Sequence, residues 1–327
     1  MRYFPSPTTN SYPQLNVLKL FCAFFVITIH VPSVIIPQYI IELISRLAVP
    51  IFFMITGFFI SESGTIITSA RCKKMCLKAL VFTVLAQGLY LFVDLCGDLL
   101  SNNDIYWIYN LSFWRNLILI GVSVNVPFWY LNALVQTLFV FWMLSHFKAQ
   151  KIIPLLIISG LFINLFLGQY SWLIDRHFVS FIHRNFFTIG IPCVGIGFLV
   201  RKFEYSLPTT RVLTLLVSVL TVLCSLEIAF LFDAGILNGR DIYLMTIFLS
   251  CAIFCLVLSL KSKAGILSYL GMKYSGLIFV FHMLVHESLS RFIPNYSLSG
   301  PFVVFVFSLI IAALFMGLKS VLSVHYK

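Results

Sequence analysis

The sequence predicts an all-α polytopic membrane protein, a bundle of about ten transmembrane helices with both termini in the cytoplasm. The first observation is composition: 60% of the 327 residues are apolar, 10% are charged, and the mean hydropathy is +1.01. A soluble domain carries roughly 25% charged residues. The second is a series of long apolar segments, and the third is a biased distribution of basic residues. Together they exclude a soluble enzyme, a secreted disulfide scaffold and a disordered chain.

Ten segments have the roughly 20 mainly apolar residues that a membrane helix requires. The stretch 105–124 contains Arg115, and we interpret it as an interfacial or re-entrant segment rather than an eleventh span. No internal repeat or long linker divides the chain, which predicts a single domain over residues 1–327. The ten predicted spans are 15–36, 39–61, 77–97, 127–146, 151–168, 184–201, 211–233, 240–260, 274–291 and 301–323.

The basic residues orient the bundle. The chain has 22 Lys and Arg against 11 Asp and Glu, a net charge of +11. If both termini are placed in the cytoplasm, sixteen basic residues fall in cytoplasmic loops and helix ends and five fall outside. Arg46 alone lies well within a span. This is the positive-inside distribution of membrane proteins. Orientation therefore accounts for most of the charge, and no nucleic-acid partner is predicted.

The eight cysteines predict neither a disulfide framework nor a metal site. They are scattered, mostly within spans, and show no metal-ligand spacing. Only Cys72 and Cys76 fall in a predicted loop, which is cytoplasmic. We interpret the buried cysteines as small apolar fillers.

Two ionisable residues lie on one face of the first span. Lys19 and His30 are eleven residues apart, which is about 16 Å of helix rise and about 20° around the axis. This geometry suits a long substrate with an anionic head and a reactive tail, such as an acyl-coenzyme A. Lys19 and the basic loop residues Arg71, Lys73 and Lys74 would hold the phosphates, and His30 would act as a general base. A snorkelling lysine and a core histidine bonded between helices are the structural alternatives.

The second span adds Glu42 and Arg46, four residues apart. A self-neutralising pair is the simplest interpretation. The first two spans are expected to form a tight hairpin near Pro37, which would place Arg46 at the depth of His30. There Arg46 would orient His30 or stabilise developing negative charge. His282 on the ninth span is expected to line the same cavity.

Five stretches resemble the integral-membrane acyltransferase family 3, in family order and over most of the chain. A basic residue eleven positions before a buried histidine resembles the family's first helix, and an Arg followed by a Pro-aromatic run and a Gly resembles its second. A "WYL" element and a late helix ending in His are also similar. The stretches are NVLKLFCAFFVITIH (16–30), SRLAVPIFFMITG (45–57), FWYL (128–131), HRNF (183–186) with 190–197, and YSGLIFVFH (274–282).

The resemblance implies a ten-helix O-acetyltransferase that moves acetyl groups from cytoplasmic acetyl-coenzyme A to an envelope glycan. The length is most similar to that of short members that modify bacterial surface polysaccharides, which implies the bacterial inner membrane and membrane lipid as surroundings. His30 matches the histidine proposed as catalytic in the family, whereas Lys19 and Asn16 stand where many members have Arg and Asp. Trp129, Tyr130 and His282 are the expected acceptor-binding residues, and no permanently bound cofactor or metal is expected.

A transporter or exporter of an amino acid or glycan is the alternative function. It would use the same helical bundle, and a pair of inverted half-helices broken by Gly or Pro would favour it. No such pair is evident in the sequence.

Overall fold

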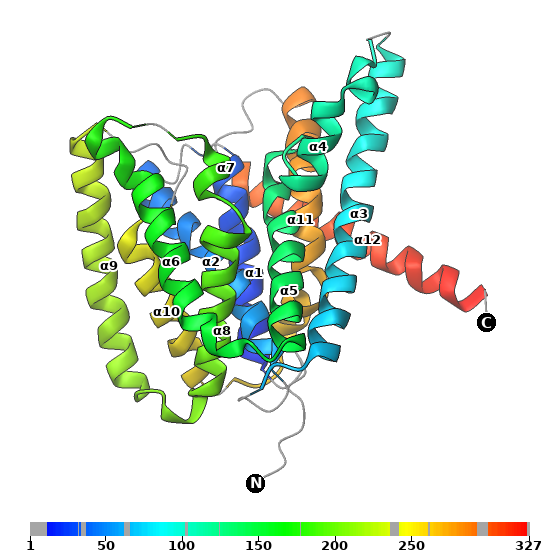
Figure 1. Cartoon of the computed structure of the whole chain (residues 1–327). Coiled ribbons are helices and arrows are strands. Elements are labelled where there is room, and N and C mark those ends of the chain that lie inside the picture. The colour runs from blue at the N-terminus through cyan, green and yellow to red at the C-terminus, as the bar shows by residue number, and fades with distance from the viewer. Residues whose placement is uncertain are drawn as a thin grey trace. The chain divides into compact units, whose positions relative to one another are not determined.

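The computed structural model describes residues 12–31, 33, 37–61, 66–101, 104–123, 125–176, 178–235, 242–260, 262–292 and 300–325. These residues form α-helices with short 3-10 segments and one π-helical segment, Phe186–Gly190, and their only β-type pairing is an isolated bridge between Ser61 and Ile67. The helices are α1 (Pro13–His30), α2 (Gln38–Ile60), α3 (Ser69–Leu100), α4 (Leu111–Leu119), α5 (Trp129–His146), α6 (Ile153–Leu167), α7 (Ser180–His183), α8 (Ile191–Lys202), α9 (Thr210–Asp233), α10 (Leu244–Ser259), α11 (Ile266–Phe292) and α12 (Gly300–His325) (Figure 1).

Each of the ten predicted spans corresponds to a helical stretch. Within the described ranges, nine stretches are long and apolar enough to cross a membrane, and α10 is a shorter apolar helix. The all-α polytopic fold is therefore confirmed. The sidedness of the termini stays a prediction.

Several boundaries differ from those predicted. The first span ends at His30 rather than at 36, because Pro32 follows Val31 and the residue before a proline avoids the helical region. Val31 accordingly has φ −109° and ψ 115°. The connection from His30 to Gln38 is thus longer than the tight hairpin expected. Helices α3 and α11 begin eight residues earlier than predicted, at Ser69 and Ile266, because their polar first turns are helical too.

The backbone contacts divide the chain into two compact units. The first contains Phe53–Tyr205, and the second contains Thr8–Phe52 and Ser206–Lys327, so that α2 runs from the second into the first. The single domain over residues 1–327 stays a prediction beside this division.

In the first unit, α3 packs against α5, and α4 of the 105–124 stretch lies beside this pair (Figure 1). Here α4 has only nine residues, which is too short to span a bilayer, in agreement with the expected interfacial or re-entrant segment. Its last carbonyl groups accept hydrogen bonds from neighbouring side chains: Asn132 Nδ2 donates to Leu117 and Ile118 at 2.8 and 2.9 Å, and Gln136 Nε2 donates to Leu119 at 2.8 Å. Non-helical backbone at membrane depth needs such partners.

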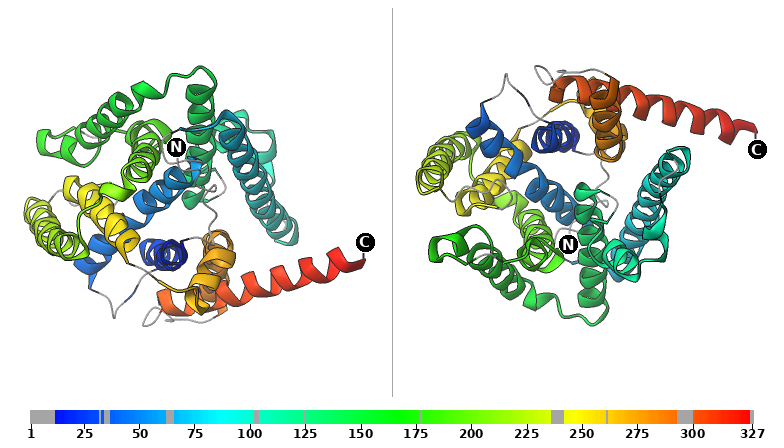
Figure 2. Two further views of the ribbon diagram at one scale, coloured as in Figure 1. Left: turned by 90° about the horizontal axis from the view of Figure 1, so that it is seen from below. Right: turned by 90° about the horizontal axis from the view of Figure 1, so that it is seen from above.

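The second unit pairs α1 with α11 and α9 with α10. Both views of Figure 2 show α1 beside α11, and α12 starts next to them. Phe24 of α1 contacts Phe302 and Phe305 of α12, with ring centroids 4.9 and 5.6 Å apart. The α1–α11 pair is the part of this unit that positions the candidate site.

Candidate functional site

The site begins on α1, which runs without a break from Pro13 to His30. Lys19 and His30 therefore keep the spacing predicted for them, about 16 Å along one face. His30 is the last residue of the helix and is half-buried. The carbonyl groups at a helix C-terminus carry partial negative charge, so this place stabilises a positive charge that forms on the imidazole.

A second imidazole lies against His30. The rings of His30 and His282 of α11 have centroids 5.6 Å apart and are tilted by 37°, a separation typical of ring pairs in contact. His282 is fully buried, and its Nδ1 lies 2.7 Å from the carbonyl oxygen of Phe279. His282 thus lies against His30, whereas the lining of a shared cavity and contact of His282 with a substrate stay predictions.

The packing of α1 against α11 is fixed near the N-terminal ends of both helices. A Cβ on Gly271 of α11 would overlap the carbonyl oxygen of Asn16 of α1, so only glycine permits this approach. Asn16 is itself buried, and its Oδ1 accepts a hydrogen bond from Lys19 Nζ at 3.4 Å. Asn16 and Lys19, two residues of the family-like first helix, thus form one polar pair at the Gly271 contact.

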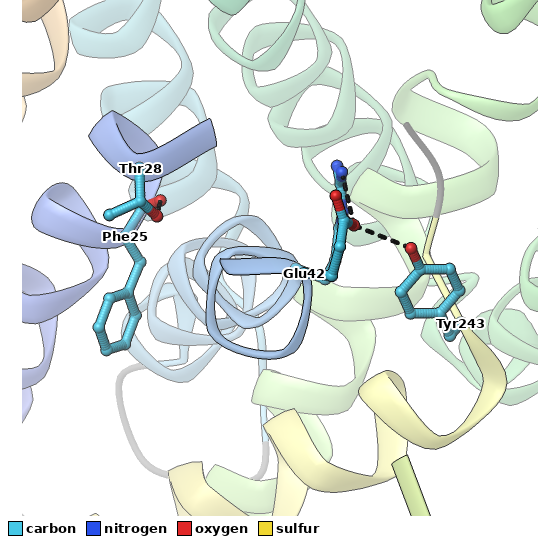
Figure 3. A network of polar contacts seen from close by, with 5 residues as sticks. Phe25, Thr28, Glu42 and Tyr243 are labelled. Atoms are coloured by element: carbon cyan, nitrogen blue, oxygen red, sulfur yellow. Dashed lines mark hydrogen bonds and ion pairs between the residues drawn. The ribbon is translucent and has the colours of Figure 1, made fainter. Parts of the chain in front are cut away.

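Arg46 is held by an acidic partner. Its Nε and Nη2 both lie 3.0 Å from Glu42 Oε2, and the Tyr243 hydroxyl donates to the same oxygen at 2.9 Å. Figure 3 shows Tyr243 reaching the Glu42 carboxylate. All three side chains are buried. The ion pair expected from the sequence is present, and a direct action of Arg46 on His30 stays a prediction.

Breaking this ion pair is expected to destabilise the protein strongly. Arg46→Met leaves the buried Glu42 carboxylate without its cation, which costs about 3–5 kcal/mol. The double variant Glu42→Met/Arg46→Met removes both charges and is expected to recover most of that loss. Thermal unfolding of the purified variants in detergent measures both effects, and a double variant no more stable than Arg46→Met would contradict this account.

The basic residues near position 71 are helical, which corrects the predicted loop. Arg71, Lys73 and Lys74 lie in the first two turns of α3, a 32-residue helix about 48 Å long, which exceeds the roughly 30 Å hydrocarbon core. Arg71 Nε donates to the carbonyl oxygen of Phe59 at 2.6 Å, and Lys73 Nζ lies 5.6 Å from the Trp142 ring centroid. Lys74 is exposed. Cys72 and Cys76, also placed in this loop, are buried in the same helix.

The two aromatic acceptor candidates differ in their surroundings. Tyr130 is buried with its ring 4.8 Å from that of Phe53. Trp129 lines a small, open hollow with Gln136 and Arg184, whose guanidinium carbon lies 5.7 Å from the Trp129 ring centroid. Of the two, Trp129 alone borders this hollow. These residues belong to the first unit, whereas Lys19, His30, Arg46 and His282 belong to the second.

Sequence reasoning missed Tyr243 and Asn132. Tyr243 is separated from Glu42 by 201 positions, and nothing local in its sequence indicates the contact. Asn132 follows directly on the FWYL stretch, and a polar amide within an apolar span was a usable signal. Among the described residues, no group of three or more His, Cys, Asp or Glu side chains can hold a metal ion, and the eight cysteines are free thiols.

The fold and the site define a polytopic helical membrane protein in which α1, α2 and α11 carry the ionisable side chains Lys19, His30, Arg46 and His282. A family model described as an acyltransferase domain matches residues 12–319. The chain belongs to this family, the integral-membrane acyltransferase family 3, and the membrane acyltransferase class follows from that membership. No curated relative and no solved structure matches the chain.

Proposed function

We propose that the protein transfers an acetyl group from cytoplasmic acetyl-coenzyme A to a hydroxyl of a cell-surface polysaccharide or its lipid-linked precursor, in a bacterial inner membrane. The observation that carries the proposal is the contact of half-buried His30 with buried His282 of α11. His30 lies on the face of α1 that also holds Lys19. A basic group about 16 Å from an imidazole fits a donor whose phosphates and thioester lie at opposite ends.

The chemistry requires one base that becomes an acid. His30 accepts the proton of the acceptor hydroxyl while that oxygen attacks the thioester carbonyl carbon. The C–S bond then breaks, the sulfur leaves with the electron pair, and the His30 imidazolium returns the proton to the thiolate. Acetylation of His30 itself, followed by transfer to the hydroxyl, uses the same residue as acyl acceptor. Mass spectrometry of protein incubated with the donor alone distinguishes the two routes, because only the second leaves an acetyl-histidine.

The direct test is transfer by the purified protein. Detergent-purified protein with radiolabelled acetyl-coenzyme A and an envelope polysaccharide or lipid-linked glycan is expected to place the label on the glycan as a base-labile ester. In proteoliposomes, solute movement without any use of acetyl-coenzyme A would refute the proposal and indicate the transporter instead.

Lys19→Ala is expected to weaken the use of the donor. The hydrogen bond of an ammonium group to a phosphate contributes about 1.5–3 kcal/mol, so the KM for acetyl-coenzyme A is expected to rise roughly tenfold or more. The turnover at saturating donor is expected to change little. Lys263→Ala, which removes an exposed lysine outside the helices, is the control. An unchanged KM in Lys19→Ala would indicate a lysine that only reaches the membrane surface.

A further inference from the structure

The hydrogen bonding of His282 defines its tautomer. Its Nδ1 lies 2.7 Å from the Phe279 carbonyl oxygen, and a carbonyl oxygen can only accept. Nδ1 therefore carries the proton, and Nε2 of the neutral ring presents a lone pair.

Among the residues that the structure describes, none is a partner for that lone pair. His282 Nε2 is buried and accepts no hydrogen bond from any described residue. A buried acceptor without a donor is unfavourable, and native structures contain few of them. The neighbouring ring on α1 that has an N–H donor is that of His30, whose centroid is 5.6 Å from that of His282.

Exposure separates the roles of the two histidines. His30 is half-buried, so a substrate can reach it. The His282 side chain is fully buried in this structure, so it acts on the reaction through another group. His286, one turn further along α11, is half-buried and next to exposed Glu287.

We propose that His282 is a positioning residue for His30: its Nε2 accepts a hydrogen bond from the one N–H of the neutral His30 ring, and this bond is retained when the other His30 nitrogen takes up a proton. This rests on the proposed function of His30 as the base. With the ring centroids 5.6 Å apart, rotation of the rings brings a His30 N–H to this Nε2 and leaves the other His30 nitrogen for the substrate.

A neutral acceptor suits this position. A carboxylate behind His30 would have to be buried as a charge, with the desolvation penalty that this entails. An imidazole held as the Nδ1–H tautomer offers one lone pair without burying a charge. The close contact of Gly271 with Asn16 holds α11 against α1, and thereby keeps His282 beside His30.

Three replacements of His282 separate the hydrogen bond that Nδ1 donates to the Phe279 carbonyl from the one that Nε2 accepts. His282→Asn keeps an amide N–H that can donate to the Phe279 carbonyl but has no acceptor at the Nε2 position. His282→Gln is longer, and its amide oxygen can take the Nε2 place. His282→Leu has neither group and reports the loss of both. His286→Asn is the matched control on the same helix.

The first measurement does not depend on acyl transfer. Diethyl pyrocarbonate modifies unprotonated histidine nitrogens, and mass spectrometry follows the rate at His30. His282→Asn and His282→Leu are expected to slow this labelling roughly five- to tenfold, the effect of about one hydrogen bond. His282→Gln is expected to restore much of it, and His286→Asn to leave it unchanged. In the transfer assay, kcat is expected to fall with the labelling rate while the KM for acetyl-coenzyme A is retained.

Equal labelling of His30 in wild type and His282→Asn would overturn the positioning role. Equal loss in His282→Asn and His282→Gln would overturn the assignment of Nε2 as an acceptor. If His282→Asn does not fold, the labelling rate of His30 in His282→Gln still decides. A rate well below that of wild type and as low as that of His282→Leu refutes the proposal. Labelling that follows the expected order in a protein that never transfers acetyl would support the positioning and refute the proposed function alone.

Discussion

Replacement of His30 by alanine is expected to abolish measurable acyl transfer, with a loss of about 10²–10⁴-fold. That is the range that a general acid–base residue contributes. His30 ends α1 and has its ring against that of His282, so alanine removes the only imidazole of this pair that a substrate can reach. The measurement is transfer of labelled acetyl groups from acetyl-coenzyme A by purified wild-type and variant protein at equal concentration.

Two further variants make this result specific. His30→Gln retains a polar side chain of similar length but cannot act as a base, and it is expected to be as inactive as His30→Ala. His146→Ala removes an exposed histidine at the end of α5 and is expected to keep full activity. Size-exclusion profiles in detergent show that each variant is folded. Normal transfer by folded His30→Ala would exclude His30 from the chemistry.

Hydropathy was sufficient for the helices but not for their ends. A run of about 20 apolar residues reports the part of a helix inside the hydrocarbon core, and each predicted span is helical. It does not report polar turns beyond the core, which is why Arg71 and Lys74 were expected in a loop and lie in α3. The end of α1 was readable from Pro32, because a proline restricts the residue before it.

The candidate site could be predicted only as far as one helix defines it. The spacing of Lys19 and His30 follows from helix periodicity, and α1 preserves it. His282 was expected in the same cavity as His30, but the contact of the two rings depends on how α11 packs against α1, which helix periodicity does not specify. The same holds for Tyr243, which reaches Glu42 from the start of α10.

Helix packing explains why two of the family-like stretches contain a glycine, Gly57 in one and Gly197 in the other. A Cβ on Gly57 would overlap the carbonyl oxygen of Val194, and a Cβ on Gly197 would overlap that of Met54. The C-terminal part of α2 and helix α8 therefore meet backbone to backbone, each with a glycine against the other's carbonyl group. Small residues permit such close packing of membrane helices, so these glycines are required by contact rather than by backbone conformation.

Gly57→Ala is accordingly expected to destabilise the first unit by about 1–3 kcal/mol, or by more if the helices cannot separate. The overlap of a methyl group with a backbone carbonyl cannot be relieved by a side-chain rotation, so α2 and α8 must move apart.

Gly88→Ala is the matched control, because a Cβ at this position of α3 meets nothing within 4 Å and alanine favours the helix. Thermal unfolding in detergent is expected to show a midpoint lowered by about 2–12 °C for Gly57→Ala and no loss for Gly88→Ala. Because Gly197 faces the same interface, Gly57→Ala/Gly197→Ala is expected to lose less than the sum of the two single losses, since one separation of the helices relieves both overlaps. Fully additive losses would mean that the two contacts yield independently and that α2 and α8 do not move as rigid neighbours.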